Sequence, residues 1–323
     1  MALSEFELIA RYFSHAGAPR EDVALGVGDD CALLRPPAGQ LLALTTDTMV
    51  DGVHFPHATR PGDLGHKALA VNLSDLAAMG AEPAWVTLAL TLPAADPAWL
   101  EAFAGGFAAL AREHGVALVG GDTTRGPLSV TVQAHGFVPP GQALTRGGAR
   151  PGDLVYVTGT LGDAGLALLA LRGEIRLPGP DLAAVRERLD RPRPRVGAGL
   201  ALRGIASACI DISDGLAADL GHILEASGAG ATLHLERLPV SATLAARLAA
   251  AGGWSLPLSG GDDYELCFTV PAARQGEAER ALAAAGCPAD RVGVIEAAPG
   301  LRCVTPEGDS VDAGRGGWQH FGG

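Results

Sequence analysis

Two stretches decide the fold, NLSDLAAMGA at residues 72–81 and GGDTTRGP at residues 120–127. Around the first stretch, apolar residues recur at helical spacing from residue 63 to residue 79, and Gly80 is a typical helix stop. The surrounding segments continue the pattern, with strands expected over 85–92, 116–120 and 128–138 and a helix over 97–114. Strands that alternate with helices indicate an α/β or mixed α+β fold.

A segment rich in proline and glycine at residues 139–150 predicts a linker, which leaves an N-terminal domain at 1–138 and a C-terminal domain at 151–323. The N-terminal domain should begin with a helix, because Ser4 and Glu7 form a capping box. A strand pair within 23–34 and a strand over 41–47 should follow. In the C-terminal domain we expect strands over 154–158, 207–212, 231–236, 264–270 and 291–295, and helices over 163–172, 181–189, 195–203, 214–226, 241–251 and 273–285.

Composition excludes several classes of protein. The formal net charge is −12 and no basic stripe is present, which argues against binding to nucleic acid. Apolar residues make up 48% of the chain, yet no apolar run reaches the length of a membrane span. The five cysteines are widely spaced and form no CxxC pair, so we expect a protein of the reducing cytoplasm.

Six acidic turns stand out: GVGDD (26–30), TTDT (45–48), NLSD (72–75), GGDT (120–123), DISDG (211–215) and SGGDDYE (259–265). Each adjoins an apolar segment, so we expect it at the end of a strand or helix, where ligands usually bind. Any single one is ordinary turn or helix-cap chemistry. Several carboxylates that converge would repel one another, and Mg²⁺ is the natural counter-charge because it prefers oxygen ligands.

The familiar nucleotide-binding and hydrolase motifs are missing. The sequence contains no GxxxxGK[ST] loop, no GxGxxG that opens a helix after a strand, no protein-kinase signature and no GxSxG elbow. A chain that uses ATP without them must bind phosphate through metal ions and backbone amides. Phosphoryl transfer suits such a site, since its catalysis is mainly positioning and charge neutralisation.

Three further side chains could complement the aspartates. Arg146 is either a surface arginine or a bidentate phosphate ligand. His54 is either a structural histidine or a substrate contact beside TTDT. Trp318 either anchors the tail or stacks on a heteroaromatic substrate.

The motifs taken together resemble the thiamine-monophosphate kinase family. The resemblance is carried by FELIARYF, GDDCALL, TTDTMVDGVHF, KALAVNLSDLAAMGA, GGDTTRGPLSVTV, ALTRGGARPGD, DISDGLAADLGH and SGGDDYELCFT, which follow the family's order from residue 6 to about residue 269. It implies the two-domain fold shared with aminoimidazole ribonucleotide synthetase and a homodimer. It also implies direct transfer of the γ-phosphoryl group of ATP to thiamine monophosphate, assisted by several Mg²⁺ ions.

The resemblance also implies residue roles. Metal ligands would be Asp30, Thr45, Thr46, Asp47, Asp75, Asp122, Asp211 and Asp214; nucleotide contacts would be Gly121, Asp122, Arg146 and Ser213; substrate contacts would be His54, Asp262 and Trp318. No residue is expected to form a covalent intermediate or act as a general base, because the acceptor is already an anionic phosphate oxygen.

This sequence departs from the family pattern at two places. The family often has GGED where this chain has Asp262 before Asp263, so the first carboxylate is one methylene shorter. The aromatic residue of the tail varies in such proteins, which affects the role of Trp318.

Two alternatives stay open. One is another ATP-using enzyme of the same superfamily, similar to aminoimidazole ribonucleotide synthetase or selenophosphate synthetase. Cys31, however, has no neighbouring lysine as a selenophosphate synthetase would. The other is a protein that binds thiamine phosphate or a nucleotide without turnover.

Overall fold

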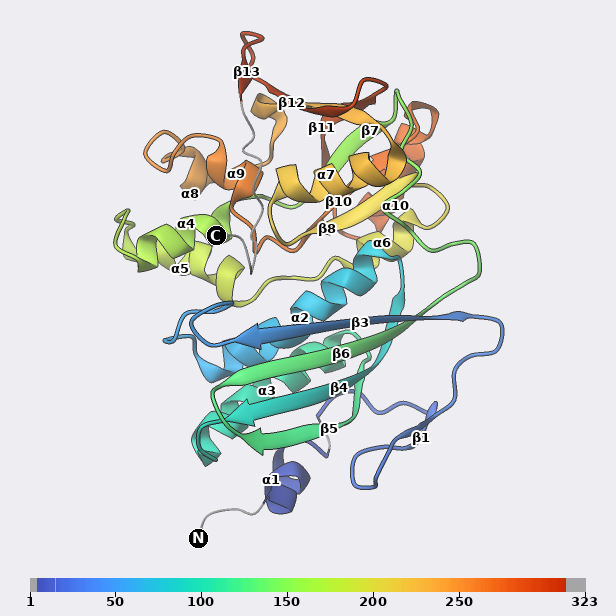
Figure 1. The fold of residues 1–323 in the computed structure, drawn as a ribbon, viewed down its shortest axis with the longest axis vertical. Coiled ribbons are helices and arrows are strands. Elements are labelled where there is room, and N and C mark those ends of the chain that lie inside the picture. The colour runs from blue at the N-terminus through green and yellow to red at the C-terminus, as the bar shows by residue number, and fades with distance from the viewer. Residues whose placement is uncertain (1–4, 15, 312–323) are drawn as a thin grey trace. The chain divides into compact units, whose positions relative to one another are not determined.

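The structure, a computed structural model, describes residues 5–14 and 16–311 (Figure 1). The chain divides into two compact units. Unit 1 comprises Met1–Leu76 and Ala81–Gly141, and unit 2 comprises Ala77–Gly80 and Gln142–Gly323. Each unit combines helices with a β-sheet, which confirms the predicted mixed α/β fold class.

Unit 1 is built on a four-stranded sheet in the order β3-β6-β4-β5, in which only β4 and β5 are parallel. A separate pair, β1 and β2, is antiparallel. The elements are α1 (Glu5–Tyr12), β1 (Val23–Leu25), β2 (Leu33–Leu34), β3 (Leu41–Val50), α2 (Pro61–Ala78), β4 (Glu82–Leu92), α3 (Pro97–Glu113), β5 (Ala117–Arg125) and β6 (Ser129–Val138).

Helices α2 and α3 lie along one face of this sheet, which we call the helix face (Figure 1). Glycines allow the two helices to cross closely, because a Cβ at Gly65 would overlap the carbonyl oxygen of Phe103 and a Cβ at Gly106 would overlap that of Gly62. The alternate side chains of the strands point to the opposite face, which we call the open face. The segment with β1 and β2 covers one end of it, where Val23 and Leu34 pack against Trp85 and Phe137. The register therefore decides which residues of β3 and β5 can meet those of α2.

Unit 2 contains a seven-stranded sheet in the order β13-β12-β9-β11-β7-β10-β8. Its strands are β7 (Leu154–Thr158), β8 (Ala208–Ile212), β9 (Gly230–His234), β10 (Glu265–Val270), β11 (Ala289–Glu296), β12 (Gly300–Val304) and β13 (Ser310–Val311). Its helices are α4 (Asp163–Leu171), α5 (Gly179–Asp190), α6 (Val196–Leu202), α7 (Leu216–Ser227), α8 (Ala242–Ala245), α9 (Ser255–Ser259) and α10 (Gln275–Ala284), with short 3-10 turns at Leu235–Arg237 and Ala272–Arg274.

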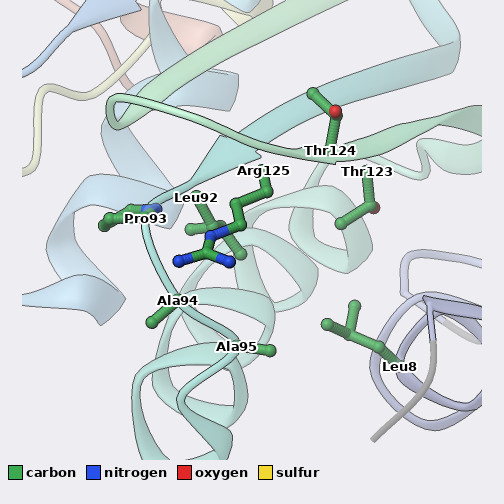
Figure 2. Close-up of a pocket in the computed structure, with 8 residues that line it drawn as sticks. All are labelled: Leu8, Leu92, Pro93, Ala94, Ala95, Thr123, Thr124 and Arg125. Atoms are coloured by element: carbon green, nitrogen blue, oxygen red, sulfur yellow. The ribbon is translucent and has the colours of Figure 1, made fainter.

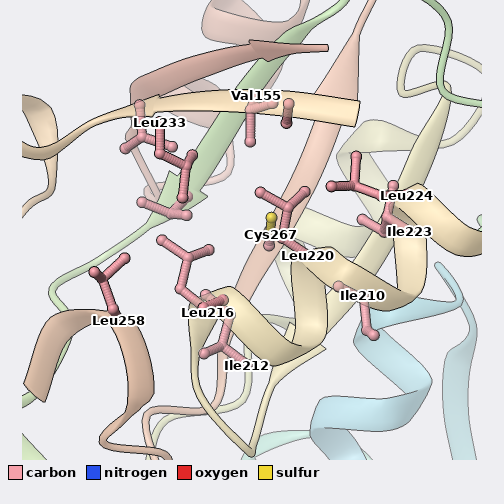
Figure 3. Packing of buried hydrophobic residues seen from close by; sticks show 14 of the residues in the cluster. Val155, Ile210, Ile212, Leu216, Leu220, Ile223, Leu224, Leu233, Leu258 and Cys267 are labelled. Atoms are coloured by element: carbon pink, nitrogen blue, oxygen red, sulfur yellow. The ribbon is translucent and has the colours of Figure 1, made fainter. Parts of the chain in front are cut away.

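Strand β10 pairs antiparallel with both β7 and β8. The carboxyl ends of β7 and β8 therefore meet the start of β10 at one end of the sheet. Figure 3 shows α7 packed over these strands, with Leu216, Leu220 and Ile223 fully buried against Ile212 and Cys267. This packing fixes the helix that follows the loop DISDG.

Several expectations about elements were wrong. The predicted helix over 241–251 shrinks to α8 (Ala242–Ala245), because the segment that follows forms turns up to α9, and the hairpin of β12 and β13 was not anticipated. TTDT, NLSD and GGDT are not terminal turns but lie inside β3, α2 and β5. Polar residues inside a strand or helix resemble the end of that element in the sequence, and the sequence pattern did not separate the two cases.

Candidate active site

In unit 1, the structure brings Thr45, Asp47 and Asp75 together. Thr45 and Asp47 alternate onto the helix face of β3, where α2 presents Asp75. The Thr45 hydroxyl donates to Asp75 Oδ2, and the Asp47 and Asp75 carboxylates lie within hydrogen-bonding range of each other. Asn72, one helical turn before Asp75, accepts from the backbone N–H of Asp47 at 3.2 Å and so ties β3 to α2.

The electrostatics of this cluster fit a bound cation. Burial, followed by the charge and hydrogen bond of Asp75, raises the pKa of Asp47 to about 7. Two half-buried carboxylates at this separation require either a shared proton or a positive ion between them. The side-chain atoms that could bind the ion are all oxygens, the ligand type that Mg²⁺ prefers, so the residues present fit that ion.

Two other predicted ligands lie on the open face instead. Thr46 alternates away from its neighbours Thr45 and Asp47. The strand register pairs Asp47 with Val132 of β6, Val132 with Leu88 of β4, and Leu88 with Gly121 of β5. Paired residues share a face of the sheet, so Gly121 lies on the same face as Asp47. The next residue, Asp122, therefore points to the open face. Asp122 is three strands away from β3.

Gly121 has a structural reason to be glycine. Its φ is +153°, and a Cβ at this position would overlap the carbonyl oxygen of Leu88 in the parallel neighbour β4. The close approach of β5 to β4 therefore requires glycine here even before any nucleotide is considered.

The remaining predicted residues of unit 1 lie in turns. Asp30 is exposed in the connection between β1 and β2. His54 follows β3 in a turn in which the backbone N–H of Val50 donates to His54 Nδ1 at 2.9 Å. This bond places the proton of the neutral ring on Nε2 and orients that nitrogen as a donor.

In unit 2, two loops lie side by side at the end of the sheet where β8 finishes and β10 begins. The backbone N–H of Asp262 donates to Ser213 O at 2.8 Å, and that of Tyr264 donates to Ile212 O at 2.8 Å. Ser213, Asp214 and Asp262 are half-buried. The structure thus places the predicted nucleotide contact Ser213 beside the predicted substrate contact Asp262.

The backbone of the second loop is strained. Asp262 (φ +59°) and Tyr264 (φ +50°) are the non-glycine residues with positive φ in the described chain. Between and after them, Asp263 and Glu265 are buried, and the Asp263 carboxylate accepts from the backbone N–H of Gly162 at 2.9 Å. Left-handed backbone at non-glycine residues is concentrated at functional sites, where surrounding contacts enforce it.

Glu265 forms the anchor of this loop and was missed by sequence reasoning. Its fully buried carboxylate pairs with Arg188 at 2.6 Å and with Arg195 at 2.5 Å, and accepts from the Thr158 hydroxyl at 2.6 Å. Arginines 188 and 195 are far away in the sequence, so no local pattern indicates the pairing.

Asp219 in α7 was also missed. One of its carboxylate oxygens accepts from the backbone N–H groups of both Ser213 and Asp214, each at 3.0 Å. Burial raises the pKa of Asp219 to about 7, while these hydrogen bonds act in the opposite direction. Asp211, three residues before Asp214, is buried within β8.

Arg146 is exposed and lies away from these loops. Its neighbour Thr145 accepts from the backbone N–H of Cys209 near the start of β8, whereas Ser213 follows the end of that strand, roughly 13 Å further along. Trp318 lies outside the described residues. The structure therefore does not test its role.

Unit 1 contains a cavity of about 440 Å³. Figure 2 shows the residues that line it: Leu8, Leu92, Pro93, Ala94, Ala95, Thr123, Thr124 and Arg125. The cavity contains none of the predicted site residues.

Over the described ranges, no three histidine, cysteine, aspartate or glutamate side chains are grouped as a metal site. None of the helices that the structure describes has both the length and the hydropathy of a transmembrane span.

Comparison with known proteins identifies the family. Residues 28–138 match the model of the N-terminal domain of AIR synthase related proteins, and residues 150–305 match that of the C-terminal domain. Thiamine-monophosphate kinase of Escherichia coli K12 is 51% identical over 323 residues, which cover 99% of each chain.

Solved structures agree with this assignment. The crystal structure of thiamine-monophosphate kinase from Stenotrophomonas maltophilia K279a has a TM-score of 0.85 at 49% identity and covers 90% of this chain and 93% of its own. A structure of AaThiL complexed with AMPPCP and TMP has a TM-score of 0.78 at 30% identity and covers 99% of each chain. The chain therefore belongs to the thiamine-monophosphate kinase family, a branch of the AIR synthase related proteins.

Proposed function

We propose that this chain transfers the γ-phosphoryl group of ATP directly to the phosphate of thiamine monophosphate, with Mg²⁺ ions held by its aspartates. The observation that carries the metal assignment is the paired carboxylates of Asp47 and Asp75 beside the Thr45 hydroxyl. The family membership supports the reaction. The structure of AaThiL with AMPPCP and TMP, in which an enzyme of the family is complexed with both compounds, supports the pair of substrates.

The mechanism follows from the charges of the reactants. Mg²⁺ at these carboxylates would neutralise the phosphates and so lower the repulsion between donor and acceptor. Asp214 would hold a further Mg²⁺ ion, Ser213 would contact the nucleotide, and Asp262 and the His54 Nε2–H would contact thiamine monophosphate. The attacking group is an anionic oxygen, so the chain needs no covalent intermediate and no general base.

We assign Asp30, Thr46, Asp122 and Asp211 to further metal contacts, and Gly121, Asp122 and Arg146 to the nucleotide, on the family resemblance. Thr46 and Asp122 share the open face of the sheet, so any metal they bind is separate from the Asp47–Asp75 pair within one copy of unit 1. Trp318 stays a predicted substrate contact.

A turnover assay tests the proposal and its main rival. The chain is incubated with ATP, Mg²⁺ and thiamine monophosphate, and ADP and thiamine diphosphate are measured together. We expect equal amounts of both products, and none with free thiamine as acceptor. A binding protein without turnover would release no ADP, and phosphorylation of free thiamine would refute the assigned acceptor.

A homodimer is also part of the proposal. Leu42 and Leu44 share the open face of edge strand β3 with Thr46 and are both about half exposed. A second copy would remove these apolar side chains from water. Sedimentation of the wild-type chain and of Leu44→Glu tests this, since a wild-type monomer would exclude it.

The place of action that we propose is the cytoplasm. All five cysteines are free in the structure, as expected of a protein that stays in a reducing compartment. Fractionation of cells with an antibody to the chain would test this, and recovery from a secreted fraction would exclude it.

A further inference from the structure

Helix α7 begins without the side-chain cap that usually satisfies the first backbone N–H groups of a helix. Its N-cap is Gly215, with φ +111° and no side-chain hydrogen bond to the first turn. Gly215 could not be replaced easily, because a Cβ there would overlap the backbone of Ser259. The loop that precedes the helix is therefore held by something other than a capping side chain at position 215.

The carboxylate of Asp219 supplies that restraint. From the first turn of the helix it reaches back to the loop, and its Oδ2 accepts from the backbone N–H groups of Ser213 and Asp214 at 3.0 Å each. Asp219 is 3% exposed, so these bonds are shielded from water. Hydrogen bonds from two N–H groups to one buried carboxylate are among the stronger kinds in proteins.

The helix that carries Asp219 is itself rigidly placed. Leu216, Leu220 and Ile223 are fully buried and point from α7 into the core of unit 2 (Figure 3). Asp219 lies between Leu216 and Leu220 in the sequence, so its backbone is fixed by the packing on both sides. A shift of the loop would have to break its hydrogen bonds to this fixed point.

We propose that Asp219 is a positioning residue: it directs the backbone N–H groups of Ser213 and Asp214 toward its own carboxylate. The loop then binds its ligand through side-chain oxygens instead of backbone N–H groups. Amides before a helix commonly bind phosphate. Here the two N–H groups are occupied by Asp219, and what the loop offers is the hydroxyl of Ser213 and the carboxylate of Asp214. That donor set suits a cation and its bound nucleotide, not a bare phosphate.

This inference rests on the proposed function, in which Asp214 binds Mg²⁺. Asp214→Asn tests that premise separately. It should raise the Mg²⁺ concentration that gives half-maximal turnover. If it does not, the metal role of this loop fails, whatever Asp219 does.

The test of Asp219 itself compares two substitutions in the full-length chain. Asp219→Ala removes the acceptor, and we expect the half-saturating Mg²⁺ concentration to rise about 10-fold, with the KM for thiamine monophosphate within about twofold of wild type. Asp219→Asn keeps an acceptor oxygen in the same place, so its Mg²⁺ dependence should stay within about threefold of wild type.

Asp153→Ala is the matched control. Asp153 is also buried and also caps a loop, accepting from the backbone N–H of Arg150 at 3.0 Å and from the Ser207 hydroxyl at 2.6 Å, but it lies at the opposite end of the sheet. It should lower the melting temperature without changing the Mg²⁺ dependence.

Three results would overturn the proposal. They are an unchanged Mg²⁺ dependence in Asp219→Ala, the same change in Asp153→Ala, and an Asp219→Asn variant as impaired as Asp219→Ala. If Asp219→Ala does not fold, Asp219→Glu replaces it, because the added methylene displaces the acceptor while the charge is kept. The Glu variant should also need more Mg²⁺, and wild-type behaviour would refute the role.

Discussion

The substitution Asp75→Asn should stabilise the protein in the absence of metal while it weakens the stabilisation by Mg²⁺. In the wild-type chain, Asp47 and Asp75 lie within hydrogen-bonding range, and the Thr45 hydroxyl donates to Asp75. Asparagine keeps an oxygen that can accept from Thr45 but removes one of the two charges. The repulsion between the carboxylates disappears, and with it one ligand of the proposed Mg²⁺ ion.

The magnitude follows from the pKa of Asp47. The rise of the Asp47 pKa from 3.8 to about 7 in the folded protein corresponds to a free-energy difference of about 4 kcal/mol between the charged and the neutral carboxyl. Because the folded pKa lies above the unfolded one, the contribution of Asp47 to the free energy of unfolding is full below about pH 4 and is lost as the pH rises through about 7. Burial is the larger cause and Asp75 the second, so we expect Asp75→Asn to recover about 1–2 kcal/mol at pH 8.

Denaturant unfolding at pH 5 and pH 8, with EDTA or with excess Mg²⁺, measures how the carboxylate pair and the bound ion change the free energy of unfolding. In EDTA the variant should be more stable than wild type at pH 8 and should lose that advantage at pH 5, where Asp47 is protonated. Excess Mg²⁺ should stabilise wild type by about 2–3 kcal/mol at pH 8, as expected at roughly 100 times the dissociation constant. It should stabilise the variant much less, and turnover of the variant should fall at least about 100-fold at saturating Mg²⁺.

Asp63→Asn provides the control within the same helix. Asp63 is buried but pairs with Arg60 at 2.7 Å, so its substitution should destabilise the protein at pH 8 and leave the Mg²⁺ response intact. The reasoning would be refuted by an Asp75→Asn variant that is less stable than wild type at pH 8 in EDTA and still gains full stability from Mg²⁺. Near-normal turnover of this variant would refute the metal role as well.

Three other predictions concern the substrate side and its support. His54→Gln should raise the KM for thiamine monophosphate about 10-fold and leave that for ATP unchanged in steady-state kinetics; equal changes in both would exclude a substrate contact. Asp262→Gly should alter the free energy of unfolding by less than about 1 kcal/mol, because relief of the left-handed backbone offsets the flexibility of glycine, yet raise the KM for thiamine monophosphate; an unchanged KM would remove Asp262 from the site. Glu265→Gln should cost about 3 kcal/mol in denaturant unfolding, since Arg188 and Arg195 lose a buried partner; a loss below about 1 kcal/mol would contradict the anchoring role.

The sequence predicted the fold class and most elements of both units, because their apolar periodicity is strong and their ends carry glycine or proline. It could not separate a polar strand from a turn, and so it placed TTDT and GGDT at element ends. It also treated the aspartates as one converging set. Strand alternation places Asp47 on the helix face and Asp122 on the open face, a consequence of the register of four strands that no local motif contains.

The supporting residues escaped sequence reasoning for a different reason. Asp219 had a local signal, since it lies five residues after Asp214 on the same helix-forming segment, but an aspartate in a first turn is ordinary helix chemistry. Asn72 likewise precedes Asp75 by one helical turn. Glu265 had no local signal at all, because Arg188 and Arg195 come from another part of unit 2.

The contacts of Asn72 and Glu265 explain how the protein keeps a repelling pair of carboxylates and a left-handed stretch of backbone in place. Asp47 stays close to a second carboxylate, and Asp262 and Tyr264 keep a left-handed backbone, each at a cost in folding free energy. In each case a buried polar contact from a rigid element holds the arrangement: Asn72 on α2 fixes the backbone of Asp47, and Glu265 at the start of β10 fixes the loop that contains Asp262. Binding of a cation then relieves the repulsion between Asp47 and Asp75, while Asp262 and Tyr264 keep their left-handed backbone, so the folded protein is already arranged for the charges that it is to bind.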